Sequence, residues 1–179
     1  PDTAPYKSSW LDNIAAADEY NAPGAFTALI GYEWTSLTEG NNLHRNVIFR
    51  DNGDKASEVV PFTVLPPQGS DNPRELWKWM AAYEQKTGGH VLAIAHNGNL
   101  SNGLMFPMIE SFTGKPVDRE YAAMRRRWEP LYEVTQTKGT GEAHPYLSPN
   151  DEFAEFELWD KGNLDGSVAK TKDMLEFEY

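Results

Sequence analysis

The chain has 179 residues, of which 40% are hydrophobic, and its formal net charge is −11 at pH 7. These values are typical of a folded domain with a substantial core, and the negative charge argues against a nucleic-acid partner, which needs a basic surface. An anionic substrate stays compatible with this charge if a bound metal ion inverts the local field. The chain contains no cysteine, so disulfide bonds and thiolate zinc sites are excluded.

The first predicted elements are a helix and a buried strand. Ser8 or Ser9 can cap the helix, and the Asn-Ala-Pro-Gly sequence at residues 21–24 ends it. Residues 26–34 are largely apolar and predict a buried strand that ends near Glu33. A carboxylate in that position is costly unless it is hydrogen-bonded or bound to a cation. Glu33 is therefore either an ordinary solvated residue or a candidate metal ligand.

The next segments alternate between strand and helix. Residues 44–51 predict a strand that begins at His44, and residues 59–64 predict a short edge strand. The Asn-Pro-Arg-Glu sequence at residues 72–75 offers an N-cap, a proline at the first helical position and an early acidic residue. It predicts a helix that ends at residues 87–89, Thr-Gly-Gly.

The apolar run at residues 91–95 is the centre of the predicted fold. It shows no alternation, which is typical of a strand buried on both faces of a parallel sheet. The strand ends at His96, and a loop of asparagines and glycines follows. Parallel α/β folds gather their chemistry at the carboxyl ends of their strands. His96 is therefore a candidate site residue, and the alternative is an ordinary histidine beside a turn.

The second half of the chain continues with an irregular apolar segment at residues 104–116 and a helix at residues 119–128. Residues 131–137 predict another buried strand, and a loop with charged side chains follows it. This loop carries Lys138, Glu142 and His144. Residues 147–159 predict another helix, capped at its start by serine and proline, with Phe153, Phe156 and Trp159 facing inward. Residues 171–179 are a further helical-looking segment.

Taken together, these elements predict a single α/β domain over residues 1–179, with parallel strands connected by helices. Side chains that can bind metals stand at or near the ends of several predicted strands: Glu33, His44, His96, Glu142 and His144. Imidazole and carboxylate ligands without cysteine suit zinc, manganese or iron. His90 stands at the opposite end of the central strand and is interpreted as a surface residue.

Several long motifs carry a resemblance to a known family. The segments GYEWTS, NNLHRNVIF, VLAIAHNGNLSNG, LYEVTQTKGTGEAHPYLSPNDEF and MLEFEY resemble a bacterial domain family of unknown function. That family is similar to the polymerase and histidinol phosphatase (PHP) superfamily of metal-dependent phosphoesterases. The resemblance implies a partial, distorted (β/α)7 barrel with parallel strands and a metal site at the strand ends. Glu33 matches the Gly-x-Glu motif of PHP enzymes, His96 their strand-end histidine and His44 an intermediate histidine.

The resemblance also implies an activity. PHP enzymes hydrolyse phosphoesters, with a metal-bound hydroxide as the nucleophile. Their substrates are anionic, and Asn97, Asn99, Asn102 and Lys138 would stand close to such a substrate here. Glu142 and His144 are further candidates for the metal ligands or for residues that support them.

This sequence departs from the PHP pattern because it contains neither a His-x-His nor an Asp-x-His pair. We therefore expect the chain to be an internal fragment of a longer hydrolase, lacking the first and last barrel strands. We expect the fragment to be inactive and to bind metal weakly or not at all, because affinity follows the number and preorganisation of the ligands. Its exposed sheet edges favour a homodimer.

Two other functions fit the sequence. The first is a non-enzymatic module that binds a carbohydrate or a peptide through aromatic side chains and the asparagine loop. The second is a scaffold whose polar residues at strand ends have no special role. No apolar run approaches the ~20 residues of a membrane-spanning helix, so we expect no membrane partner. The sequence assigns no cellular compartment.

Overall fold

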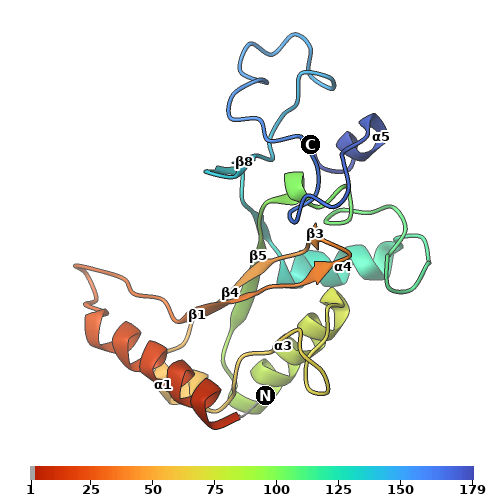
Figure 1. Cartoon of the computed structure of the whole chain (residues 1–179). Helices are drawn as coiled ribbons and strands as arrows, with labels where there is room; N and C mark the ends of the chain where they lie inside the picture. Colours follow the sequence, from red (N-terminus) through yellow and green to blue (C-terminus); the bar gives the residue numbers. More distant parts are fainter. Residues whose placement is uncertain (1–2) are drawn as a thin grey trace.

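The computed structural model describes residues 3–179 and is built around a small mixed sheet (Figure 1). Four strands form this sheet in the order β1-β4-β5-β6. They are β1 (Gly31–Trp34), β4 (Arg45–Phe49), β5 (Val91–Ala95) and β6 (Leu131–Tyr132). β4 is antiparallel to both β1 and β5, and only β5 and β6 run parallel.

This topology contradicts the predicted barrel. We expected a partial, distorted (β/α)7 barrel with parallel strands and with its first and last strands missing. Residues 3–179 instead form small, mostly antiparallel sheets and no closed barrel. Residues 35–44, which connect β1 to β4, are too few for the helical crossover that a parallel pair requires. They form a hairpin of β2 (Leu37–Thr38) and β3 (Asn41–Asn42) instead.

The path between β4 and β5 explains why these two strands are antiparallel. The chain leaves β4 and passes through α2 (Gly53–Ala56). It then returns along the sheet, so that the carbonyl of Asp71 accepts a hydrogen bond from Ser36 Oγ at 2.9 Å. Helix α3 (Pro73–Thr87) runs back again to the end of β4, where the amide of His90 donates to Asp51 at 2.6 Å. The connection thus runs along the sheet once in each direction. For this reason β5 begins beside the end of β4.

The helix signals around residues 72–88 are confirmed. Asn72 Oδ1 accepts a hydrogen bond from the Arg74 amide at 3.0 Å, and Gly88 ends α3 in the left-handed conformation with φ of 63°. The predicted helix at residues 119–128 is also confirmed as α4 (Arg119–Trp128), with Asp118 as its N-cap. Helix α1 (Thr3–Tyr20) begins earlier than the serines that were expected to cap it.

One face of the sheet carries the main core. Helices α1, α3 and α4 all contribute buried side chains to a cluster with β4 and β5, and this cluster includes Trp10, Val47, Phe49, Trp77 and Trp128. The alternate residues of the two central strands point to the other face and are less buried. The sheet is therefore covered on one face, and its second face is partly open. The prediction that residues 91–95 are buried on both faces of a parallel sheet is wrong, because Leu92 and Ile94 are only partly buried and β5 is antiparallel to β4.

Four predicted elements differ in the structure. The buried strand expected at residues 131–137 is divided into β6 and β7 (Thr135–Gln136), which belong to different sheets, and Leu131 and Val134 are exposed. The strand expected at residues 26–34 is limited to β1, and residues 59–64 form no strand.

Residues 147–159 form turns instead of a helix, and Phe153, Phe156 and Trp159 are exposed rather than inward-facing. A helix of about 13 residues is only marginally stable in water, even with good caps, unless its apolar side packs against a core. These apolar side chains are exposed instead.

The C-terminal part of the chain lies beyond the end of β5 (Figure 1). It contains three short elements after β6: β7 (Thr135–Gln136), β8 (Gly139–Thr140) and α5 (Lys172–Leu175). The loop after β5 includes a single 3-10 turn at Gly98–Leu100. Within residues 3–179, no helix has both the length and the apolar character to cross a membrane.

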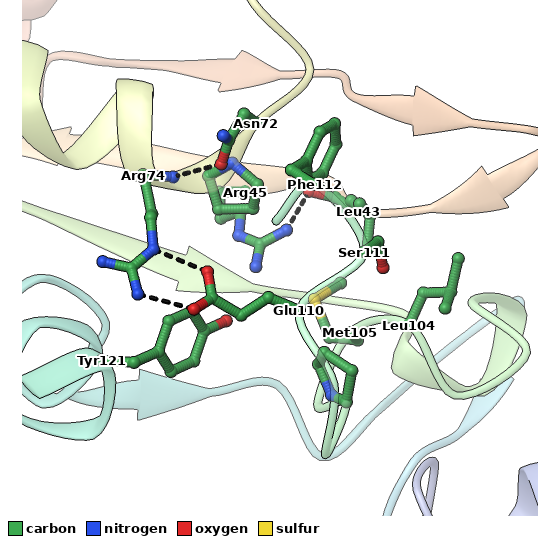
Figure 2. A pocket seen from close by; sticks show the side chains of 12 residues that line it. Leu43, Arg45, Asn72, Arg74, Leu104, Met105, Glu110, Ser111, Phe112 and Tyr121 are labelled. Carbon is green, nitrogen blue, oxygen red and sulfur yellow. Dashed lines mark hydrogen bonds and ion pairs between the residues drawn. The ribbon is translucent and has the colours of Figure 1, made fainter. Parts of the chain in front are cut away.

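An ion pair between Arg74 and Glu110 connects the start of α3 to the irregular segment at residues 104–116 (Figure 2). Arg74 Nε and Nη2 each donate to a carboxylate oxygen of Glu110 at 2.6 Å. The hydrogen bonds from Arg74 hold the pKa of Glu110 below its usual value, although burial acts in the opposite direction. A two-point contact between guanidinium and carboxylate fixes the orientation of both groups.

This depressed pKa predicts a loss of stability in acid. Glu110 binds fewer protons in the folded chain than in the unfolded chain, where its pKa is about 4.3. Its contribution is complete above that pH and disappears as the pH falls through the folded pKa. We therefore expect Glu110→Gln to be less stable than the wild type at neutral pH, and to lose less stability on acidification. Urea denaturation at several pH values measures this difference, and parallel pH curves for both proteins would contradict it.

Candidate metal centre

Three of the predicted metal ligands stand together on the open face of the sheet. Glu33 pairs with Asn46 across β1 and β4, and Asn46 pairs with Ile94 across β4 and β5. His44 lies two residues before Asn46, and His96 lies two residues after Ile94. Because side chains alternate along a strand, all of these residues point to the same face.

The antiparallel pairing of β4 and β5 is what brings the two histidines together. Arg45 at the start of β4 pairs with Ala95 at the end of β5. His44 and His96 are the next residues outward on each strand, and the amide of His96 donates to the carbonyl of His44 at 3.4 Å. In a parallel pair, a strand start and a strand end lie at opposite edges of the sheet. The antiparallel pairing of β4 and β5 therefore explains why the two histidines converge, whereas the predicted parallel strands do not.

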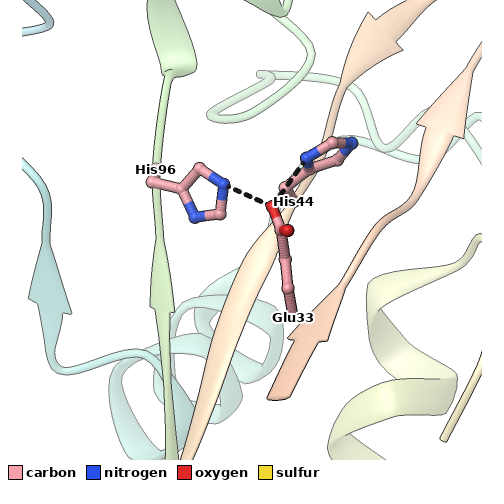
Figure 3. Close-up of side chains that lie close together, drawn as sticks. All are labelled: Glu33, His44 and His96. Atoms are coloured by element: carbon pink, nitrogen blue, oxygen red, sulfur yellow. Dashed lines mark hydrogen bonds and ion pairs between the residues drawn. The ribbon is translucent and has the colours of Figure 1, made fainter. Parts of the chain in front are cut away.

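The carboxylate of Glu33 links the two imidazoles (Figure 3). Its Oε1 lies 3.0 Å from His44 Nδ1 and 2.9 Å from His96 Nε2. One nitrogen of each histidine and one oxygen of Glu33 all lie within 4.8 Å of one another. A divalent cation such as zinc holds its donors at about 2.0–2.2 Å, so donors around it are roughly 3–4 Å apart. The donor set and its compactness fit such an ion.

Burial and charge favour the metal-binding form of His44. Burial lowers the pKa of His44, Glu33 acts in the opposite direction, and the charges of His96 and Lys138 add to the lowering. The imidazole is therefore neutral at neutral pH, which is the form that binds a cation. Glu33 is the most open of the three, with a side chain 44% exposed, so the centre is accessible from solvent.

His96 has an unusual environment. Its side chain is only 6% exposed, and Nδ1 has no hydrogen-bond partner among the described residues. Buried polar atoms without a partner are rare in folded proteins and indicate a ligand, a water molecule or a functional role. The nitrogen without a partner is Nδ1, whereas Nε2 is the nitrogen that faces Glu33, so this observation is separate from the geometry of the metal donors.

The loop that carries Glu142 and His144 does not join this group. His144 Nε2 lies 3.1 Å from Asp160 Oδ2, and its Nδ1 accepts a hydrogen bond from the Tyr146 amide at 3.1 Å. Both ring nitrogens are thus engaged elsewhere. Glu142 lines a separate open hollow with Asp151. In the part of the chain that the structure describes, the group of possible metal donors comprises Glu33, His44 and His96.

The asparagines after His96 divide into two kinds. The side-chain amides of Asn99 and Asn102 donate to the carbonyls of Lys138 and Val168 at 3.0 and 3.2 Å, so both hold the C-terminal region in place. Asn97 is also buried, but its Oδ1 has no partner among residues 3–179. Of the predicted substrate residues, Asn97 and Lys138 keep polar atoms that other described side chains do not occupy.

Sequence reasoning missed three residues that support this loop. Asn42 contacts the backbone of both histidine segments. Glu133 Oε2 accepts from the Asn97 amide at 3.3 Å, and the hydroxyl of Tyr132 accepts from the Gly98 amide at 3.0 Å. Each of the three contacts a backbone group far away along the chain, and no local sequence pattern indicates such a contact.

Comparison with known proteins gives one match. A family model described as "Protein of unknown function (DUF3604)" matches residues 1–179. No curated protein and no solved structure matches the chain significantly.

Proposed function

We propose that this chain, which belongs to the DUF3604 family, contributes part of the metal centre of a metal-dependent hydrolase similar to the PHP phosphoesterases. The convergence of Glu33, His44 and His96 on one face of the sheet carries this proposal. The three residues are separated along the chain by other elements, and a compact set of two imidazoles and a carboxylate is a common ligand set for zinc and iron.

Each residue has a role in this proposal. His44 and His96 would hold the cation through the nitrogens that face Glu33, and Glu33 would add a carboxylate oxygen and a negative charge. When bound, such a cation would act as a Lewis acid, which polarises a phosphoryl oxygen and lowers the pKa of a bound water molecule. Lys138 lies close enough to His44 to affect its pKa, and it has no ion-pair partner among the described residues. Its ammonium group is therefore suited to hold the anionic part of a substrate.

The sequence departures limit what the chain does alone. His-x-His and Asp-x-His pairs, which complete PHP centres, do not occur in it. From the sequence we expected weak or absent metal binding. Because the three donors lie close together, we propose instead that they suffice to bind one cation, and that hydrolysis requires ligands from a longer protein. The chain alone is then a metal-binding part of the enzyme without turnover.

A zinc titration of the 179-residue chain tests the ligand assignment. We expect one bound ion per chain in calorimetry, and His96→Ala is expected to weaken binding by more than the 10- to 100-fold typical of residues that only support ligands. His90→Ala is the matched control, because His90 is an exposed histidine at the other end of β5. Absence of zinc-dependent heat in the wild type, or equal losses in both variants, would contradict the assignment.

An open hollow favours a second candidate function, the binding of a carbohydrate or a peptide. Its volume is 630 Å³, and its lining includes the exposed rings of Phe153 and Phe156 with Glu142 and Asp151. Exposed aromatic patches often mark binding surfaces. Glycan and peptide array binding that Phe153→Ala abolishes, and that persists in the His96→Ala variant, would support this function over the metal centre.

A further inference from the structure

Asn42 occupies the space between the two histidine segments. It is the last residue of β3, two residues separate it from β4, and it is 1% exposed. Its side-chain nitrogen donates to the carbonyls of His96 and Asn97 at 2.7 and 3.0 Å. Its side-chain oxygen accepts from the amide of His44 at 3.3 Å. One amide group therefore binds both segments that carry the imidazoles.

These contacts lie just beyond the end of the β4–β5 ladder. The β4–β5 ladder ends at the pair Arg45 and Ala95. Beyond it, a single long hydrogen bond of 3.4 Å connects the His96 amide to the His44 carbonyl. Strand ends with few backbone contacts open more easily than the middle of a sheet. Asn42 adds three side-chain hydrogen bonds at this point and so continues the connection between the strands past the ladder.

From this geometry we infer that Asn42 is a positioning residue of the metal centre, which sets the distance between the His44 and His96 imidazoles. The inference rests on the proposed function, because it concerns the affinity of the same three ligands. Asn42 touches neither imidazole, and it acts through the backbone atoms on which each side chain stands. Preorganised ligands bind a metal more tightly than ligands that must first be brought together.

Two substitutions separate the contacts of Asn42. Asn42→Ala removes all of these hydrogen bonds. The His96 carbonyl and the His44 amide then lose this partner, while the Asn97 carbonyl keeps its hydrogen bond from the Leu100 amide at 3.0 Å. Asn42→Asp keeps the shape and the acceptor for the His44 amide, but it places a carboxylate oxygen against the carbonyls of His96 and Asn97. Both variants loosen or distort the spacing of the two histidine segments.

Asn41 supplies a matched control next to it. Asn41 is also buried, and its side-chain nitrogen donates to the carbonyls of Thr38 and Glu39 at 3.1 and 3.4 Å, within the same hairpin. Its side chain makes no hydrogen bond to either histidine segment among the described residues. Asn41→Ala and Asn41→Asp therefore disturb the hairpin to a similar degree without changing the connection between His44 and His96.

The experiment measures zinc affinity by calorimetry in the 179-residue chain and its variants. We expect the Asn42 variants to raise the dissociation constant for zinc by about 10- to 100-fold, the effect typical of residues that support metal ligands. We expect the Asn41 variants to keep the wild-type constant. Equal constants for wild type and Asn42→Asp, in a wild type that binds zinc and loses it in His96→Ala, would overturn the inference alone. A wild type that binds no zinc would overturn the proposed function instead.

A second measurement uses only the wild type and so does not depend on the folding of the variants. In NMR spectra, zinc is expected to shift the side-chain amide signals of Asn42 and to slow their exchange with water. The side-chain amide signals of Asn41 are expected to stay unchanged. Asn42 signals that neither move nor gain protection when zinc binds would also overturn the inference.

Discussion

Replacement of Glu129 by alanine is expected to lower the free energy of unfolding by about 3–5 kcal/mol, the cost of leaving a buried charge without its partner. Glu129 follows α4, and its side chain is 2% exposed. Its Oε1 accepts from Arg45 Nε at 2.9 Å and from Trp77 Nε1 at 2.8 Å. Arg125 Nη2 lies 3.0 Å from its other oxygen. The guanidinium of Arg45 is fully buried. Alanine at position 129 removes the carboxylate that compensates its charge.

The pKa of Glu129 agrees with this role. Burial raises the pKa, but the charges of Arg45 and Arg125 outweigh burial and hold the pKa below its usual value. The carboxylate is therefore charged at neutral pH and compensates the guanidinium groups around it. Arg45 also stands next to His44 and over the ring of Trp34, at 5.7 Å from the ring centroid. The ion cluster thus supports the strand start that carries a candidate metal ligand.

Urea denaturation followed by tryptophan fluorescence measures this effect. Glu75→Ala is the control, because the pair of Glu75 with Lys78 is exposed on α3 and such pairs contribute about 0–1 kcal/mol. Glu129→Gln keeps the shape and an acceptor for Trp77, so we expect a smaller loss than for alanine. A Glu129→Ala variant as stable as the Glu75→Ala variant would show that the buried cluster contributes nothing.

Replacement of Glu178 by alanine is expected to have a large but local effect. Lys170 and Glu178 form a buried ion pair, with side chains 3% and 0% exposed. Lys170 Nζ also donates to the carbonyl of Asn99 at 2.8 Å, and Glu178 Oε1 accepts from the Gly103 amide at 3.3 Å. The pair therefore fastens the end of the chain to the loop after His96. Loss of one partner of such a pair costs about 3–5 kcal/mol, here for the opening of this region.

Hydrogen exchange followed by mass spectrometry distinguishes local from global opening. In Glu178→Ala, we expect protection to fall in residues 97–103 and 160–179, and to persist in β4 and α3. The double variant Lys170→Met, Glu178→Leu is expected to recover part of the protection, because a buried ion pair can be replaced by apolar side chains of similar size. Equal loss of protection in α3 would show that the C-terminal region and the core open together, against this prediction.

Local sequence patterns determined several features correctly. The Asn-Pro start of α3, the bounds of α4 and the apolar run of β5 all follow from capping, periodicity and composition. The same reasoning identified Glu33, His44 and His96 one at a time, as polar residues beside apolar strands. It wrongly predicted a helix at residues 147–159, because capping residues alone do not stabilise a helix that packs against no core.

Only the tertiary structure decided how these residues meet. The direction of β5 depends on the path of residues 50–72, which return along the sheet before α3 begins, and no local pattern records that path. It places the start of β4 beside the end of β5, and with it His44 beside His96. His144 instead contacts Asp160, away from this group. The sequence therefore specified the chemistry of the side chains, and long-range strand pairing decided which of them lie close together.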